Sequence, residues 1–333
     1  MKKKIKFLSA VTFFILLREF YCALIYIFNI SICRGDKKFL TRLFDLNKEA
    51  SAIAADLKAE SSSLEKWIKT SSHRRYYIRS FDNIPLYAET FHAKEKTDNW
   101  AILVHGFGTD GASVFYAGKK FTENGFNVLI PDCRGHGRSG GKYIGFGIPD
   151  SNDIIYWCRL ILKYNSSANI VLYGISMGAA AVMCTSDKNT LPKNVRCIIE
   201  DSGYTSAYDI LDYKIKEIFS APTFPLLFFL NILCIVKAGY GIFSPSPLKA
   251  VKSSKVPILF IHGRKDTFVP PRMNTRLYQS CTSPKERFTV KNAGHGVSSF
   301  IAEKKYWKNI FTFAEKYIPA RKIQIENTQE ISE

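Results

Sequence analysis

The sequence predicts an α/β fold in which helices cover both faces of a mainly parallel sheet. From residue 100, short apolar runs alternate with segments of helical periodicity, a pattern typical of β-α-β units. With 333 residues, 46% of them hydrophobic, the chain can bury one large core. The predicted strands cover residues 100–104, 127–130, 169–173, 195–199, 257–261 and 287–290, and the predicted helices cover residues 114–123, 154–163, 177–187, 271–281 and 300–317.

Residues 1–33 read as a membrane anchor or an uncleaved signal. A basic cluster at residues 1–6 precedes an apolar run at 7–17, and a second apolar run at 20–32 follows the charged Arg18 and Glu19. The combined length suffices to cross a bilayer, although charges near its middle are costly there. We expect one membrane segment, and the basic cluster favours the N-terminus inside and the following domain outside. A buried helix of a soluble domain is the alternative.

Residues 34–74 are predicted to form a helical spacer between this segment and the main domain. Apolar residues recur at helical spacing over residues 43–67, and three serines at 61–63 could cap a second helix. Residues 75–79 and 86–91 then alternate in polarity around a polar turn, which predicts a β-hairpin. At the other end of the chain, residues 319–333 read as a polar tail.

The formal net charge of +18 raises the question of an anionic partner. Apart from the N-terminal cluster the lysines are scattered, and the sequence has neither zinc-ligand spacing nor an aromatic-basic signature of RNA binding. We therefore expect attraction to a membrane surface, and no nucleic acid, metal or cofactor. The eight cysteines lack C-x-x-C spacing and most fall in apolar segments, which predicts buried thiols. Thiols favour a reducing compartment, opposite to the side that the basic cluster favours.

One segment interrupts the α/β alternation. Residues 218–236 carry no charge and include four phenylalanines and two prolines. The run is long enough to cross a membrane, but its prolines and its position inside the alternation argue against this. We expect residues 205–247 to form a small helical cap over the C-terminal edge of the sheet. Its apolar face would partly line a pocket or, alternatively, be buried without contacting a ligand.

The most informative stretch is GISMG at residues 174–178, between a predicted strand and a predicted helix. In a nucleophile elbow the serine occupies a sharp strand-to-helix turn, often with positive φ, and the flanking glycines let the neighbouring chain cross. The Ser176 hydroxyl would then lie at a helix N-terminus, where backbone N–H groups favour negative charge. A chance match in a loop is the alternative.

The glycine-rich loop HGFGTDG at residues 105–111 allows two interpretations. It matches G-x-G-x-x-G after a strand, and Asp132 follows at the distance of a ribose-binding carboxylate in dinucleotide-binding domains. Such domains usually begin with this unit, however, and here about a hundred residues precede it. The other interpretation is an oxyanion loop, in which the N–H groups of Phe107 and Met177 surround a developing negative oxygen. We favour the second, because the first leaves Ser176 without a role.

A serine hydroxyl is a weak nucleophile and needs a base, which a carboxylate orients. On this type of sheet the partners follow in the order serine, acid, histidine, each in a loop after a strand. Asp266 follows the strand at residues 257–261, and His295 lies in a glycine-flanked loop after the last strand. We predict a triad of Ser176, His295 and Asp266, with Asp201 as the alternative acid. Taken singly, Asp266 would be a turn cap and His295 a hydrogen-bonded loop residue.

Residues 75–318 resemble α/β-hydrolases, and five motifs carry the resemblance. They are LVHGFG at 103–108, PDCRGHGRSGG at 131–141, YGISMG at 173–178, FIHGRKDTFVP at 260–270 and AGHG at 293–296. The set is similar to the serine-aminopeptidase-like and monoglyceride-lipase-like branch, and the N-terminal segment resembles that of membrane-anchored bacterial members.

The resemblance implies an α/β-hydrolase fold and a serine hydrolase that uses the predicted triad and the two amides. It also implies that residues 132–139 form a structural turn, which removes Asp132 from ribose binding. The expected reaction is hydrolysis of a carboxylic ester, or of an amide or thioester, through an acyl-enzyme, with a small-molecule or lipid-like acyl substrate. An aminopeptidase-type amide hydrolase and a catalytically silent, membrane-tethered binding module are the alternatives.

Overall fold

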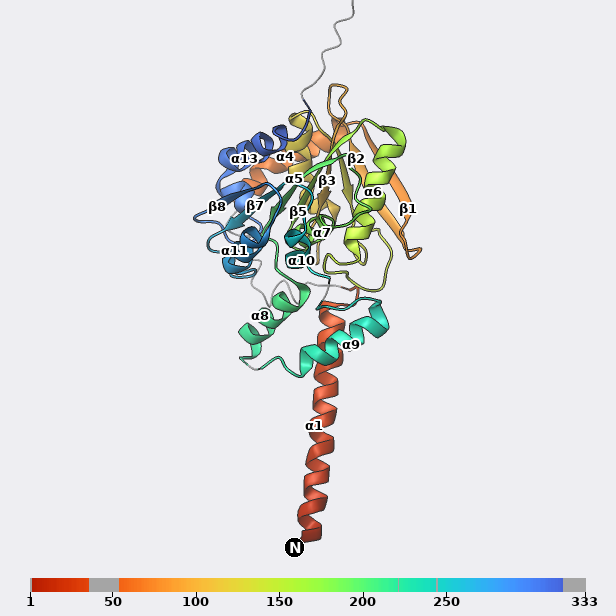
Figure 1. The fold of residues 1–333 in the computed structure, drawn as a ribbon, viewed down its shortest axis with the longest axis vertical. Coiled ribbons are helices and arrows are strands. Elements are labelled where there is room, and N and C mark those ends of the chain that lie inside the picture. The colour runs from red at the N-terminus through yellow and green to blue at the C-terminus, as the bar shows by residue number, and fades with distance from the viewer. Residues whose placement is uncertain (1, 36–53, 221, 244, 320–333) are drawn as a thin grey trace, which may run out of the picture.

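The computed structural model describes residues 2–35, 54–220, 222–243 and 245–319, and an eight-stranded sheet forms its centre (Figure 1). The strand order is β1-β2-β4-β3-β5-β6-β7-β8. β1 and β2 form an antiparallel hairpin, β2 also pairs antiparallel with β4, and the remaining neighbours pair in parallel. The mainly parallel sheet is therefore confirmed. The strands are β1 (His73–Arg79), β2 (Pro85–Phe91), β3 (Asn99–Val104), β4 (Asn127–Pro131), β5 (Asn169–Ile175), β6 (Val195–Asp201), β7 (Ile258–Gly263) and β8 (Lys285–Val290).

Helices cover both faces of this sheet, as the sequence predicts. Alternate residues of each strand pack on opposite sides. In β5, Ile170 and Leu172 pack on the side of α6 and α7, whereas Val171 and Tyr173 pack on the side of α5 and α13. The helices are α1 (Lys2–Ser31), α4 (Ala54–Thr70), α5 (Phe115–Glu123) after the 3-10 turn η1 (Gly111–Val114), α6 (Asp150–Tyr164), α7 (Met177–Met183), α8 (Ala207–Phe219), α9 (Leu226–Ala238), α10 (Pro247–Lys252), α11 (Pro271–Ser280), α12 (Ser298–Ile301) and α13 (Glu303–Glu315).

Two predictions near the N-terminal side of the chain need comment. The serines at residues 61–63 do not cap a second helix, because they lie inside α4, where the Ser61 hydroxyl donates to the Lys58 carbonyl (2.7 Å). The first part of the predicted spacer, residues 36–53, lies outside the described residues, as does the tail at 320–333.

Three further helix boundaries differ from the prediction. α6 begins at Asp150, four residues before the predicted start, and the Asp150 carboxylate accepts from the Gly147 N–H (3.0 Å). α7 ends at Met183 rather than at residue 187, and turns follow it. The closing helix is divided into α12 and α13 at Ala302, whose φ of −126° is not helical. Six of the eight cysteines are buried, as predicted for most of them.

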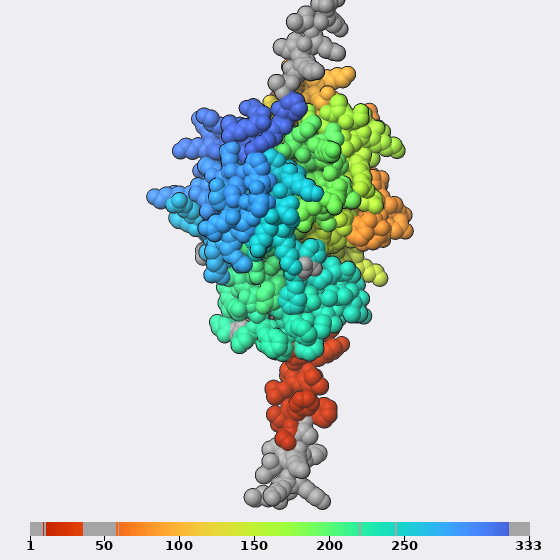
Figure 2. All heavy atoms as spheres, viewed as in Figure 1, coloured from red at the N-terminus to blue at the C-terminus, as the bar shows by residue number. Residues whose placement is uncertain are grey.

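The C-terminal end of α1 is joined to the body of the molecule. The Ile144 N–H donates to the Ile32 carbonyl (2.7 Å), and the Arg34 guanidinium donates to the carbonyls of Gly137 and Ser139 (2.6 and 2.5 Å). The cap helices α8 and α9 lie beside this junction, at the C-terminal edge of the sheet (Figure 1). The exposed middle of α1 emerges beyond them (Figure 2).

Candidate active site

Ser176 lies in the sharp turn between β5 and α7. Its φ of 56° and ψ of −113° place it in a conformation that a non-glycine residue rarely adopts. The turn needs glycine on both sides. A Cβ at Gly174 would lie 2.3 Å from the Gly178 carbonyl oxygen, and a Cβ at Gly178 would lie 2.1 Å from the Val104 carbonyl oxygen. Because neither glycine has a Cβ, the chain can approach this closely, and α7 starts directly over the sheet with the Ser176 hydroxyl at its N-terminus.

The structure brings Ser176, His295 and Asp266 together. His295 Nε2 lies 2.8 Å from Ser176 Oγ, and His295 Nδ1 lies 2.8 Å from Asp266 Oδ2. The three residues follow β5, β8 and β7, whose carboxyl ends share one edge of the sheet. The Asp266 side chain is fully buried, while 9% of the His295 side chain is exposed.

Asp266 also caps the turn that follows it. Its Oδ1 accepts hydrogen bonds from the N–H groups of Phe268 (2.9 Å) and Val269 (2.8 Å), which leaves Oδ2 directed at His295. Burial alone would raise the pKa of Asp266, but the charge of His295 and hydrogen bonds from His262 and His295 outweigh burial. Together they hold the pKa of Asp266 well below its usual range, so this carboxyl is ionised.

His262 is a second imidazole on the same carboxylate, and the sequence analysis missed it. Its Nε2 lies 2.9 Å from the Val269 carbonyl oxygen and 3.2 Å from Asp266 Oδ2. Burial would lower the pKa of His262, but Asp266, followed by Glu200 and the Val269 carbonyl, raises it above the ordinary value. The available signal was the FIHGRKD motif, in which this histidine precedes Asp266 by four residues.

The glycine loop passes beside the serine. A Cβ at Gly106 would lie 3.5 Å from Ser176 Cβ and 4.0 Å from Ser176 Oγ, so Gly106 lies next to the serine side chain. Met177 is the first residue of α7, where backbone N–H groups have no partner within the helix. His136 Nε2 accepts from the Gly108 N–H (3.1 Å) and supports the loop from below. Phe107 and Met177 directly follow Gly106 and Ser176 in the chain, and the oxyanion hole that their amides would form stays a prediction.

The structure contradicts the dinucleotide interpretation of this loop. Asp132 Oδ1 accepts from the Gly111 N–H (2.8 Å), and Oδ2 accepts from the Arg138 N–H (2.6 Å). A Cβ at Gly137 would lie only 2.2 Å from Asp132 Oδ2. The carboxylate thus ties the glycine loop to the following turn, and a ribose would have to displace that backbone.

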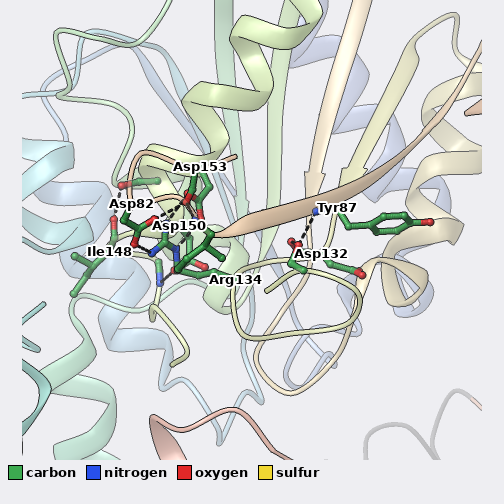
Figure 3. Close-up of polar contacts among 12 residues, drawn as sticks. Asp82, Tyr87, Asp132, Arg134, Ile148, Asp150 and Asp153 are labelled. Carbon is green, nitrogen blue, oxygen red and sulfur yellow. Dashed lines mark hydrogen bonds and ion pairs between the residues drawn. The ribbon is translucent and has the colours of Figure 1, made fainter. Parts of the chain in front are cut away.

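The same turn is fixed by Arg134, the centre of a buried charge cluster (Figure 3). The guanidinium donates to both oxygens of Asp153 (2.7 Å each) and to both oxygens of Asp82 (2.7 and 3.2 Å). Arg134 therefore connects the turn to α6 and to the β1–β2 hairpin. The cluster holds the loops next to the site and does not reach Ser176.

Asp201, the alternative acid, has other partners. Its Oδ2 accepts from the Tyr306 hydroxyl (2.7 Å), and its Oδ1 accepts from the Ser202 hydroxyl (2.9 Å). Tyr306 in turn lies 2.8 Å from the Tyr173 hydroxyl. Burial raises the pKa of Asp201 above its usual value. The geometry thus places Asp266, and not Asp201, against His295.

Residues 205–247, predicted as a cap, contain α8 and α9, and α8 contacts the acid loop. The Tyr213 hydroxyl donates to the Thr267 carbonyl (3.3 Å), and Lys214 Nζ lies 4.9 Å from the centre of the Phe268 ring. The Phe268 ring packs against His295, with centroids 4.7 Å apart. Within the described ranges, no group of three His, Cys, Asp or Glu side chains has metal-binding geometry.

Comparison with known proteins supports this architecture. Residues 100–225 match the family model described as the alpha/beta hydrolase fold. The protein YqkD of Bacillus subtilis is 28% identical over 67% of this chain and 73% of its own length. The membrane protein YNL320W of Saccharomyces cerevisiae is 27% identical over 70% of this chain and 76% of its own length. That relative and the apolar α1 support membrane association.

Solved structures show the same fold. The Pyrococcus furiosus esterase Pf2001 superposes with a TM-score of 0.61 and 21% identity, covering 75% of this chain and 93% of that one. At this identity the neighbour shows the fold alone. The family match, the strand order and this likeness together show that the chain has the α/β-hydrolase fold.

Proposed function

We propose that this protein is a serine hydrolase that cleaves a carboxylic ester, thioester or amide through an acyl-enzyme. The observation that carries the proposal is the continuous pair of 2.8 Å contacts from Ser176 through His295 to Asp266. A proton on His295 Nδ1, donated to the ionised Asp266, leaves Nε2 free to accept the proton of Ser176.

In the first half-reaction Ser176 Oγ attacks the carbonyl carbon while its proton passes to His295 Nε2. The tetrahedral intermediate then collapses, and the leaving group departs with the proton from His295. In the second half-reaction His295 deprotonates a water molecule, which attacks the acyl-enzyme. Collapse of this second intermediate releases the carboxylic acid and returns the proton to Ser176.

The oxyanion of each intermediate would be held by the backbone amides of Met177 and Phe107. The first is at the N-terminus of α7 and the second is in the loop that passes Ser176 Cβ. Preorganised donors of this kind each contribute about 10²–10³ in kcat. The aromatic rings of Phe107, Phe146 and Phe268 near this position favour an apolar acyl group.

We further propose that α1 anchors the enzyme in a membrane. The helix contains the 21-residue apolar segment Val11–Ser31, which is long enough to cross a bilayer. Within it, Arg18 and Glu19 form an ion pair (3.7 Å), which lowers the cost of two charges in an apolar phase. The basic cluster at residues 1–6 favours the N-terminus inside and the hydrolase domain outside.

Labelling with a fluorophosphonate probe tests the catalytic proposal. The wild-type protein, solubilised in detergent, should be labelled covalently, and Ser176→Ala should abolish labelling because the probe reacts only with an activated serine. Ser166→Ala, at an exposed serine before β5, is the matched control and should be labelled like the wild type. Persistent labelling of Ser176→Ala would reject Ser176 as the nucleophile. A panel of acyl esters of graded length and of aminoacyl amides then identifies the bond cleaved.

A further inference from the structure

Apart from Asn231 and Lys237, helix α9 consists of apolar residues. Leu227, Leu230 and Cys234 form a buried stripe that packs on the domain. The opposite face carries five large apolar side chains, all more than 40% exposed, and they are Phe228, Phe229, Ile232, Ile235 and Val236. A surface helix of a soluble domain normally presents polar residues on that face.

The exposed face of α9 continues onto α1. The rings of Phe20 and Phe229 meet edge to face with centroids 5.5 Å apart. Around this contact α1 exposes large apolar side chains of its own, which are Val11, Phe13, Phe14, Ile15, Leu16, Leu17, Tyr21 and Tyr26. Figure 1 shows α9 crossing α1 where α1 leaves the body of the molecule. The two helices therefore present one contiguous apolar surface, of a size that marks an interaction site.

The length of α1 places α9 at membrane depth. Residues 7–19, between the basic cluster and the contact at Phe20, span about 20 Å at 1.5 Å per residue. The hydrocarbon core of a bilayer is roughly 30 Å thick. If α1 crosses it, the last third must be crossed by the part of α1 that already contacts α9. The hydrogen bonds of Ile32 and Arg34 to the body fix this arrangement.

We propose that the outer face of α9 lies in the lipid bilayer, at the boundary between head groups and acyl chains. This inference rests on the proposed membrane anchoring by α1. The partner is the acyl region of the lipid, because the face carries no charge before Lys237 at its end. The cap and the edge of the sheet that bears Ser176 then face the membrane surface.

Fluorescence quenching in vesicles tests the position of α9. A single cysteine is placed by Ile232→Cys in a Cys22→Ser, Cys33→Ser background, in which the other six cysteines are buried. The full-length protein is labelled with an environment-sensitive fluorophore and reconstituted in phosphatidylcholine–phosphatidylglycerol vesicles. We expect doxyl groups on the lipid chains to quench the label, and iodide in the water to leave it unaffected. Ile235→Cys repeats the test at a second exposed site, and retained fluorophosphonate labelling shows that each variant is folded.

Two matched labels separate this inference from the proposals on which it rests. Leu16→Cys reports on α1 alone and should be quenched by the doxyl lipids. Tyr164→Cys, at the opposite edge of the sheet just before β5, should be quenched only by iodide. Loss of doxyl quenching at Leu16 would reject the anchor, and with it the docking of α9. If doxyl lipids quench the label at Leu16→Cys but iodide quenches the label at Ile232→Cys, the anchor stands and the docking of α9 is rejected. Protection of the Ile232→Cys label from both quenchers would also reject the docking, because it indicates that protein covers this face.

Discussion

The carboxyl ends of β6 and β7 lie side by side, and the buried carboxyl groups at the two ends have pKa values shifted in opposite directions. At the end of β6, burial raises the pKa of Asp201 and raises the pKa of Glu200 to about 8. At the end of β7, the pKa of Asp266 is held well below its usual range, although burial opposes this. The carboxyl groups at both ends are almost fully buried, so burial alone does not determine the direction of the pKa shift.

The difference lies in the partners. Asp201 accepts from two neutral hydroxyl groups, and Glu200 accepts from the Gly203 N–H (2.9 Å) and the Asn274 side chain (2.7 Å). Asp266 instead contacts two imidazoles through one oxygen. Imidazoles can carry positive charge, whereas amides and hydroxyls cannot. Of these three carboxyl groups, only Asp266 contacts imidazoles, and the following predictions test this contrast.

The largest expected effect is that of Asp266→Asn. We expect kcat for a soluble p-nitrophenyl ester to fall about 10⁴-fold, because an amide neither fixes the His295 tautomer nor stabilises the imidazolium. The matched control is Asp201→Asn, the same change on the neighbouring strand, for which we expect a loss of less than about tenfold in kcat. The reverse order of the two effects would move the orienting acid to β6. Circular dichroism of both variants checks that the fold is retained.

A smaller effect is expected at His262. Replacement by Leu removes a hydrogen bond to a buried carboxylate, which should lower the free energy of unfolding by about 1.5–3 kcal/mol. His262→Gln keeps a side-chain N–H donor and should recover part of that loss. Urea unfolding measures the stability, and kcat against KM on the same ester reports the catalytic share. We expect His262→Leu to lower kcat rather than raise KM, since a displaced Asp266 misaligns His295. An unchanged kcat in a folded His262→Leu variant would limit this residue to a structural role.

The smallest effect, measured per pH unit, is expected in the dependence of the free energy of unfolding on pH. The folded pKa of Glu200, about 8, lies above the ordinary value of 4.5, so the folded state keeps a proton that the unfolded state releases between these values. Stability should therefore fall as pH rises from about 4.5 to 8, by at most about 1.4 kcal/mol per pH unit. Asp266 has the opposite sign: its stabilisation is fully present above its ordinary pKa of 3.8 and is lost only at acidic pH, as pH falls through its low folded pKa.

Glu200→Gln should flatten the part of this profile between about pH 4.5 and 8, since glutamine does not titrate. Urea midpoints at a series of pH values measure the effect, and Glu315→Gln, at an exposed glutamate on α13, serves as the control. A profile with the same slope in Glu200→Gln and in the wild type would show that Glu200 is ionised in the folded protein.

The parts of the site that short motifs encode could be predicted from the sequence. The elbow around Ser176 and the loops bearing Asp266 and His295 each follow a strand, so parallel order alone places them at one edge. The supporting contacts could not be predicted, because they depend on packing between distant segments. The contact between His262 Nε2 and Asp266 Oδ2, for example, depends on the path of the turn after β7. The pairing of Phe20 with Phe229 joins segments more than two hundred residues apart.

The junction between Arg34 and the carbonyls of Gly137 and Ser139 has a mechanical consequence. A domain joined to its membrane helix by a long flexible linker could reach substrates far from its point of attachment. Here α1 is one continuous helix, and hydrogen bonds at its C-terminal end join it directly to the sheet-containing domain. A hydrolase held in this way would act only on substrates in a thin layer next to the membrane, and lateral diffusion of the whole molecule would determine the membrane area that it reaches.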